Sequence, residues 1–307
     1  MANQDFKIVS ELIRNPLESY EMIGSKVGLS GVSVRSRILK MHRSGFIQGI
    51  YLMPSPLNFE RHPRTYVFKN IESPFTKLLE ISAVNGVVFA WLDYDNDMII
   101  TVFSRSELEN ARSLAKLSKI LGAKPITDYI PISLLPPNLS SSKLSRIDWK
   151  ILKHVAFNPR LSIVEISRLT HLSRKTVQGH LNQMLSERKL YAVYISDFTK
   201  INGGIFYGLL VFFTFPEVLD RLLKLGLEPI WYMSEPLGAV LLGFAESLED
   251  VELLKKKTGE MEGITSFYIN VPREGMFAED QVSFWIGKEI DKWDSSSFHE
   301  KSKVLRI

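Results

Sequence analysis

The sequence of 307 residues contains no cysteine. This absence excludes disulfide bonds, cysteine-based zinc sites and catalysis by a thiol. Histidine is scarce, with six residues, and the chain shows no His-x-x-x-His pair, Ser-His-Asp set or glycine-rich phosphate loop. We therefore expect no catalytic residue, no bound cofactor and no metal site.

Long apolar runs are also missing. No uninterrupted run reaches the roughly 20 residues that a helix needs to cross a bilayer, and the first residues lack the basic-then-apolar pattern of a signal peptide. An apolar content of 45% and a charged content of 23% are ordinary for a globular protein. We expect a cytoplasmic protein of two or more domains that has no membrane partner.

The sequence contains an ungapped internal repeat. Residues 5–51 and residues 148–194 align at a constant offset of 143, with 12 identities in 47 pairs. Unrelated segments of average composition would share about three. The repeat therefore indicates a duplicated unit. The matched pairs include Asp5 and Asp148, Asn15-Pro16 and Asn158-Pro159, Leu29-Ser30 and Leu172-Ser173, and Tyr51 and Tyr194.

Each copy of the repeat has the pattern of a winged helix-turn-helix. In the first copy an apolar helical face over residues 5–14 ends at Asn15-Pro16, Ser19 is placed to cap a second helix, and Ser30 a third. The short segment Val27–Ser30 has the length of the tight turn in this motif. Phe46–Tyr51 is strand-like.

A second kind of unit follows each helical unit. Residues 60–135 predict the order β-α-β-β-α-β of a ferredoxin-like fold, from the strand Thr65–Lys69 to a last strand Pro125–Ile130. The same order returns after Ile201, and a tail helix over Asp280–Asp291 follows it. The expected fold class is α+β, a tandem duplication. The predicted divisions are winged helix 1 at 1–59, ferredoxin-like domain 1 at 60–135, a linker at 136–145, winged helix 2 at 146–201, ferredoxin-like domain 2 at 202–274 and a helical tail at 275–307.

The positive charge is concentrated in the helical units. Residues 1–59 carry a net +3 and residues 143–201 a net +7, whereas residues 202–307 carry −6. Such a distribution is typical of a protein that binds a polyanion. The third helix of each unit carries cations, amides and hydroxyls that reach phosphates and base edges in a major groove. The predicted DNA contacts are Arg174, Lys175, Thr176, Gln178 and Asn182 in the second unit and Ser33, Arg35, Ser36 and Lys40 in the first.

This pattern resembles the Lrp/AsnC (feast/famine) transcription regulators of bacteria and archaea. The resemblance is carried by Asp5–Ile8 and Asp148–Ile151, by the two Leu-Ser pairs, and by Arg37-Ile38 with Gly45–Ile47. It covers nearly the whole chain, twice, so the chain looks like a regulator dimer fused into one polypeptide. The resemblance implies double-stranded DNA as the partner and a role in transcription control.

The resemblance also implies a ligand pocket near the turn between the second and third strands of each sheet unit. The family usually has a Gly-x-aromatic-Asp turn there. The first copy reads Tyr94–Asp97, which keeps Asp97 but has no glycine, and the second reads Ser234–Gly238, which has no aspartate. A small-molecule effector is therefore left open. Asp93, Asp95 and Asp97 alternate like metal ligands, but we interpret them as a solvated turn.

Two alternatives stay open beside DNA binding. Siroheme decarboxylases are similar in architecture and work as two related halves, but they would need cationic and histidine side chains around a haem-sized pocket. Winged helices also serve as protein-binding modules, and Arg37 in the first unit is open to a purely structural role.

We expect the two ferredoxin-like units to pair sheet against sheet within one chain, because each exposes an apolar face that needs a cover. Val88, Ala90, Ile100 and Val102 are the residues predicted for that face. The apolar tail helix, which includes Phe284 and Trp285, is expected to dock on its own chain or to mediate self-association.

Overall fold

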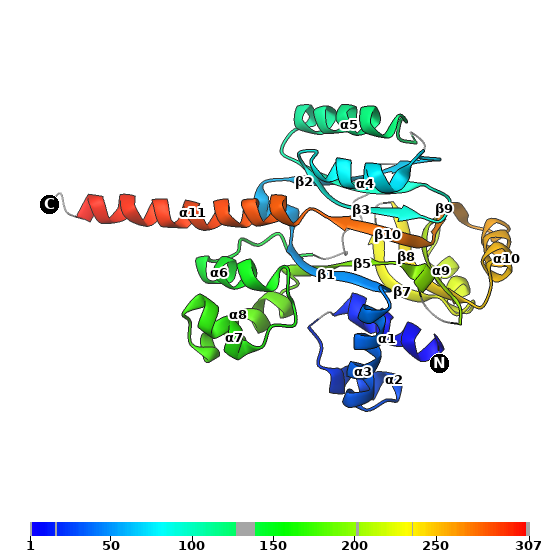
Figure 1. Cartoon of the computed structure of the whole chain (residues 1–307), viewed down its shortest axis with the longest axis horizontal. Helices are drawn as coiled ribbons and strands as arrows, with labels where there is room; N and C mark the ends of the chain where they lie inside the picture. Colours follow the sequence, from blue (N-terminus) through cyan, green and yellow to red (C-terminus); the bar gives the residue numbers. More distant parts are fainter. Residues whose placement is uncertain (1, 16, 127–138, 201–202, 235, 305–307) are drawn as a thin grey trace.

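The computed structural model describes residues 2–15, 17–126, 139–200, 203–234 and 236–304 (Figure 1). Its first half has the predicted order of helices and strands. Its elements are α1 (Ala2–Arg14), α2 (Tyr20–Val27), α3 (Gly31–Arg43), β1 (Ile47–Pro54), the short 3-10 helix η1 (Pro56–Phe59), β2 (His62–Phe68), α4 (Pro74–Ser82), β3 (Val87–Asp93), β4 (Met98–Ser104) and α5 (Glu107–Leu121).

The second half repeats this order and then adds two strands and a long helix. Among the described residues, no helix is both long and apolar enough to cross a membrane. The elements are α6 (Arg146–Val155), α7 (Ile163–Thr170), α8 (Arg174–Ser186), β5 (Leu190–Ser196), η2 (Phe198–Lys200), β6 (Ile205–Phe213), α9 (Glu217–Leu223), β7 (Glu228–Ser234), β8 (Leu237–Ala245), α10 (Leu248–Gly259), β9 (Ile264–Asn270), β10 (Pro272–Phe277) and α11 (Glu279–Val304).

The two larger sheets differ in how they are completed. The second sheet has the strand order β7-β8-β6-β9, which is the ferredoxin-like order. The first has the order β10-β3-β4-β2, so its edge beside β3 is filled by a strand from the end of the chain. The strand β10 was not predicted from the sequence. Of the predicted strand Pro125–Ile130, the residues from 127 on lie outside the described residues. The N–H of Ile126, which is described, donates to the carbonyl of Val67 in β2 (2.9 Å).

The wing strands of the two helical units pair with each other. β1 and β5 run antiparallel, with Tyr51 opposite Val193 and Ile50 opposite Tyr194. Tyr51 and Tyr194 are equivalent positions of the repeat, as are Ile50 and Val193. The pairing therefore has a local pseudo-twofold axis between Ile50 and Tyr51, as expected for a duplicated unit that pairs with its own copy.

The hydrophobic cores cross between the two halves of the chain. Phe6 of the first helical unit packs edge-to-face on Phe206 of the second sheet, with ring centroids 5.4 Å apart. The second helical unit shares a core with the first sheet and α11, which brings together Trp149, Phe103 and Trp285. Each helical unit is therefore anchored on the sheet unit of the opposite half, an exchange that the sequence did not predict.

The predicted sheet-to-sheet pairing is confirmed. The Tyr268 hydroxyl of β9 donates to Asp93 at the end of β3 (2.5 Å), and a cavity between the two sheets is lined by residues of both. The prediction of the facing residues was wrong at all four positions. Ala90, Ile100 and Val102 face the unit's own helices, and Val88 packs in the core shared with α11.

The tail helix docks on its own chain. Val282, Trp285 and Ile286 are buried in the core shared with α6, whereas Phe284 is 61% exposed. Figure 1 shows the end of α11 projecting beyond the body of the molecule. The intramolecular form of the docking prediction is therefore confirmed, and it depends on Trp285 rather than on Phe284.

Candidate nucleic-acid interface

The third helix of each helical unit begins at the predicted serine. The Ser30 hydroxyl accepts the Ser33 N–H (3.2 Å) and the Ser173 hydroxyl accepts the Thr176 N–H (3.0 Å). Each cap satisfies a backbone donor that the first turn leaves without a helical partner. The two caps fix where α3 and α8 begin and thereby which residues lie on their outer faces.

One face of each of these helices is buried and the opposite face carries most of the predicted DNA contacts. Val177, Leu181 and Met184 hold α8 on its unit, as Val34, Ile38 and Met41 hold α3. Two of the predicted residues, Ser33 and Thr176, are half-buried, and their hydroxyls bond to the capping serines at 2.9 and 2.8 Å. The other predicted contacts are exposed: Arg174, Lys175, Gln178, Asn182, Arg35, Ser36 and Lys40.

The amides on α8 are ordered by each other. Gln178 Nε2 donates to Asn182 Oδ1 at 2.7 Å, and both side chains are exposed. This bond leaves the carbonyl oxygen of Gln178 and the amide hydrogens of Asn182 for a base edge, the donor and acceptor types that recognise adenine.

A repeat-related side-chain contact ties each of these helices to the first helix of its unit. Arg37 contacts Asp5 at 2.6 Å, and His180, the equivalent of Arg37, contacts Asp148, the equivalent of Asp5, at 2.7 Å. Asp148 also accepts the N–H of Ser145 in a capping box. The structural role considered for Arg37 is confirmed.

The remaining cations of the first unit lie mainly on α3. Lys26 pairs with Glu11 and Glu18, and Arg14 pairs with Glu11 and Glu228. Arg35, Lys40 and Arg43 have no ion-pair partner within 4 Å among the described residues, and the same is true of Arg174 and Lys175 on α8. Each of the two capped helices therefore carries exposed cations that are available to a polyanion.

Arg160 joins the two helical units. Its Nη1 donates to the carbonyl of Glu18 (2.7 Å), and its guanidinium lies over the ring of Tyr20, 4.8 Å from the centroid. Burial lowers the pKa of Arg160. Arg160 occupies the repeat position of Leu17. A cation at a position that is apolar in the other copy is the sequence signal that could have singled it out.

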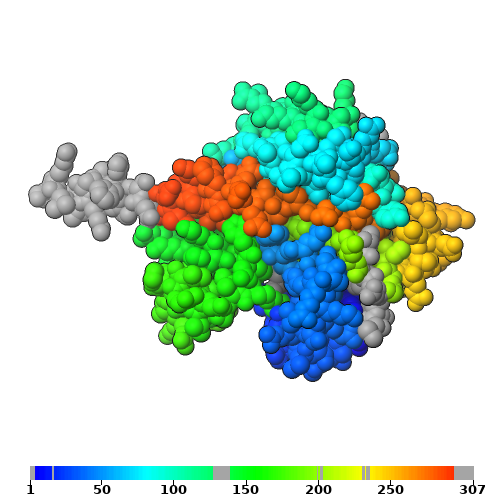
Figure 2. Space-filling view, in the orientation of Figure 1, coloured from blue at the N-terminus to red at the C-terminus, as the bar shows by residue number. Residues whose placement is uncertain are grey.

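Both helical units lie on one side of the molecule. Figure 1 shows α1–α3 below the β1–β5 ribbon, α6–α8 beside and below its left end and the first sheet above it, and Figure 2 shows the same helical units as two adjacent lobes. The ribbon and the Arg160 contact set the relative position of the lobes.

The turn between β3 and β4 is more buried than the sequence suggested. Asp95 is exposed as predicted, but Asp93 and Asp97 are only 2% and 6% exposed, so the solvated-turn interpretation was wrong for these two. Asp93 Oδ1 accepts the N–H groups of Asp95 and Asp97 at 3.0 and 2.9 Å. Among the described residues, no group of three His, Cys, Asp or Glu side chains could hold a metal ion.

The carboxylates of this turn face the other half of the chain. The Tyr268 hydroxyl donates to Asp93; the Asp93 side chain is buried and Tyr268 is half-buried. Burial raises the pKa of Asp93 and of Asp97, and burial next to Asp93 raises the pKa of Tyr268. The phenol therefore remains protonated and donates to the carboxylate. Sequence reasoning missed Tyr268 because its partner lies 175 positions away.

The raised pKa of Asp93 leads to a pH-dependent stability. Because the folded state disfavours the ionised carboxylate, the stability that this group contributes is lost as the pH rises from its ordinary pKa of 3.8 through its raised pKa in the folded protein. In Asp93→Asn that pH-dependent part disappears, although the hydrogen bond from Tyr268 is also affected. The stability of Asp93→Asn relative to the wild type should therefore rise with pH in urea titrations. Asp95→Asn, at the exposed position of the turn, is the control. A difference that falls with rising pH would contradict the prediction.

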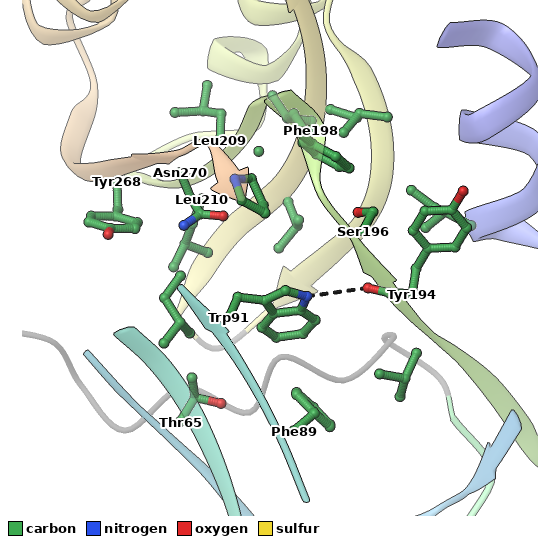
Figure 3. A pocket seen from close by; sticks show the side chains of 18 of the residues that line it. Thr65, Phe89, Trp91, Tyr194, Ser196, Phe198, Leu209, Leu210, Tyr268 and Asn270 are labelled. Carbon is green, nitrogen blue, oxygen red and sulfur yellow. Dashed lines mark hydrogen bonds between the residues drawn. The ribbon is translucent and has the colours of Figure 1, made fainter. Parts of the chain in front are cut away.

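A cavity of about 170 Å³ lies between the two sheets (Figure 3). Its described lining contains no lysine, arginine, histidine, aspartate or glutamate. The siroheme decarboxylase alternative requires cations and histidines around a haem-sized pocket, and the described lining of this smaller cavity contains neither. The lining includes Thr65, Val67, Phe89, Trp91 and Ile99 from the first sheet, Gly208, Leu210, Val240, Leu242 and Asn270 from the second, and Ala192, Tyr194 and Ser196 from β5.

Two family models match the helical units. An AsnC-type helix-turn-helix domain matches residues 1–42, and a winged helix-turn-helix DNA-binding model matches residues 144–188. No curated protein matches the chain significantly.

Several solved structures are similar to the chain over different lengths. The siroheme decarboxylase NirDL, in co-complex with an iron-uroporphyrin III analogue, has 13% identity and a TM-score of 0.48, over 94% of this chain and 99% of that one. AsnC of E. coli has 18% identity and a TM-score of 0.30, over 44% and 97%. LrpC of B. subtilis has 23% identity and a TM-score of 0.31, over 42% and 94%.

The matched models and the fold agree on the nature of the helical units. Each unit is followed by a sheet unit, and the whole order occurs twice. The chain therefore carries two helix-turn-helix domains, the first of AsnC type and the second of a winged DNA-binding type, each followed by a sheet unit.

Proposed function

We propose that this protein is a transcription regulator that binds double-stranded DNA with sequence preference, as a fused pseudo-dimer. The observation that carries the proposal is the pair of serine-capped helices, α3 and α8, whose exposed faces hold cations without ion-pair partners among the described residues. Cations and amides on such a helix contact phosphates and base edges in the major groove.

The two helices have unequal parts in this proposal. On α8, Arg174 and Lys175 occupy the first turn and Gln178 and Asn182 follow on later turns. On α3, the positions equivalent to Arg174 and Lys175 are Gly31 and Val32, and Val32 is 80% exposed. The second unit should therefore contribute more of the affinity, while Arg35, Ser36 and Lys40 contact the groove from the first.

This inequality predicts a non-palindromic binding site. A homodimer presents two identical units and prefers symmetric operators, because operator symmetry mirrors protein symmetry. Here the pseudo-twofold relates units with different side chains. We expect two unlike half-sites separated by one helical turn or a small multiple, and an affinity that falls steeply with salt as counterions are released.

The deciding experiment is selection of bound duplexes from a random pool, followed by footprinting. Two protected and dissimilar half-sites are the expected result. A perfect palindrome would contradict the asymmetry, and one protected half-site would show that the first unit does not contact DNA. No binding at low salt would contradict the function itself. A porphyrin-type absorption band in the purified protein would instead favour the enzyme alternative.

A further inference from the structure

A groove lies between α11 and the first sheet unit and shares no described lining residue with the inter-sheet cavity. Its volume is about 770 Å³. On the sheet side the described lining comes from the segments before β2 and β3 and after β4, and on the helix side from residues 281–292 of α11. Because α11 follows the repeated order of elements, the groove lies outside the duplicated architecture.

One carboxylate holds the sheet side of the groove in place. Glu109 Oε1 accepts hydrogen bonds from Arg61 Nη1 at 2.7 Å and from Asn85 Nδ2 at 3.1 Å. Glu109 Oε2 accepts the backbone N–H of Arg105 at 2.8 Å. Three residues of the lining are therefore positioned by a single side chain, which reduces the ordering cost of binding.

The helix side is fixed to the sheet by Gln281 in the first turns of α11. Gln281 Oε1 accepts the N–H of Gly86 at 2.7 Å, and Gln281 Nε2 donates to the carbonyl of Val87 at 2.5 Å. Both ends of the amide are thus bonded to the backbone at the start of β3. The two walls of the groove therefore have a defined separation.

Arg61 brings a hydrogen-bond donor to the groove that the described residues do not satisfy. Its side chain is 7% exposed, and its Nη1 donates to the Phe103 carbonyl at 3.1 Å as well as to Glu109. Its buried Nε has no hydrogen-bond partner among the described residues. A buried donor of a charged group is costly to leave unpaired, so an acceptor oxygen in the groove would lower the free energy of the bound state.

Two further cations of the groove have no anionic partner. Lys292 pairs with Glu60 at 3.2 Å and with Glu289 at 2.8 Å. Arg105 and Lys288 are exposed and have no ion-pair partner within 4 Å in the described part of the chain. The described lining holds four cations and two carboxylates. This excess favours a dianion such as a phosphate monoester, which carries about two negative charges near neutral pH.

Phe284 gives the groove an exposed aromatic surface. It is 61% exposed, although the neighbouring Trp285 is only 6% exposed. Lys288 Nζ lies 5.4 Å from the centroid of the Phe284 ring, so a cation and an aromatic face lie next to each other. A flat ring that stacks on Phe284 would remove apolar surface of both rings from water. A ligand that joins a ring to a dianion would use both features.

We propose that the groove between α11 and the first sheet unit binds an aromatic phosphate monoester, with the phosphate facing Arg61, Arg105 and Lys288 and the ring on Phe284. A nucleoside monophosphate has this chemistry, and the volume of the groove lies within the range of small-molecule sites. The proposal does not rest on the proposed function, and its tests use no DNA.

The first experiment titrates the full-length protein with adenosine monophosphate and with phenyl phosphate, using calorimetry. Saturable binding of one molecule per chain is expected for at least one of them. Adenosine and phenol lack the phosphate, inorganic phosphate lacks the ring, and each should bind at least about tenfold more weakly. No saturable binding of either monoester would overturn the site. Inorganic phosphate that binds as tightly as the monoesters would overturn the part assigned to the ring.

The second experiment removes the unpaired cations. The double variant Arg105→Ala/Lys288→Ala should bind the monoester at least about tenfold more weakly. Lys255→Ala/Lys257→Ala removes the same charge from the exposed surface of α10 and should bind within about twofold of the wild type. Thermal melting checks that both variants are folded. An unchanged affinity in the groove variant, or equal losses in the two variants, would overturn the site.

The third experiment tests the ring contact with Phe284→Ala, which should weaken binding of the monoester at least about threefold. Leu79→Ala is the control, because Leu79 is a 77% exposed apolar residue on α4 and is not part of the described lining. It should leave the affinity within about twofold of the wild type. Equal affinities of the two variants would refute stacking on Phe284.

Discussion

Simultaneous replacement of Arg174 and Lys175 by alanine is expected to weaken DNA binding by at least about 30-fold. Each cation that contacts a phosphate or base edge contributes roughly 1–3 kcal/mol, and about 1.4 kcal/mol corresponds to a tenfold change in affinity. Both side chains are exposed in the first turn of α8 and have no ion-pair partner among the described residues. Their removal therefore takes little from the folded state.

The mechanism also predicts a change in salt dependence. If both residues contact phosphates, the slope of log affinity against log salt should become less steep by about two units. Fluorescence anisotropy at several salt concentrations measures the affinity and the slope together. The helix should remain folded, because Val177, Leu181 and Met184 and the Ser173 cap are untouched.

The matched control removes the same charge elsewhere. Lys255 and Lys257 are exposed on α10 of the second sheet unit, away from both helical units. Their replacement by alanine should change the affinity by less than about threefold, since only the long-range field of the protein is altered. Equal losses in the two double variants would indicate a general charge effect, and no loss in the α8 variant would refute the assignment of α8.

Trp285→Ala should be the most destabilising single substitution in the tail, with a loss of about 3–5 kcal/mol. Trp285 is 6% exposed and packs against Phe59 and Phe103, with ring centroids 5.6 and 6.3 Å away. The Arg61 guanidinium lies over its ring, 4.3 Å from the centroid. Truncation would open a cavity and leave Arg61 without its aromatic partner.

The neighbouring aromatic provides the control. Phe284 is 61% exposed, and Phe284→Ala should change the free energy of unfolding by no more than about 0.5 kcal/mol. Urea unfolding, followed by circular dichroism, compares both variants with the wild type. Equal stabilities of the Trp285 and Phe284 variants would show that the docked tail adds nothing to the fold.

The stability loss should also reach the second helical unit. α11 packs on α6. The ring centroids of Trp149 in α6 and Phe59 are 5.4 Å apart, and Phe59 also contacts Trp285. Hydrogen exchange in α6 should therefore accelerate in Trp285→Ala, while α1 of the other unit, which has a separate core, should change less.

Local patterns in the sequence determined the helices, their caps and most of the strands. Ser30 caps the helix that it was predicted to cap, and Ser173, its equivalent in the repeat, caps the corresponding helix of the second copy. These features depend on side chains that act on backbone within a few residues, so a short window contains all the necessary information. The duplication was visible in the sequence because residues 5–51 and 148–194 align without a gap.

Three features depended on contacts between distant segments. Val87–Asp93 is apolar on both faces, so its alternation could not show which face meets the unit's own helices. β10 contains Pro272 and Gly275 and is a poor strand former by composition; it is a strand because β3 offers a free edge about 180 positions earlier. The exchange of helical units between sheet units is invisible in a repeat, because both pairings bury equivalent faces. Only the tertiary structure distinguishes them, through contacts such as Phe6 with Phe206, whose side chains lie 200 positions apart.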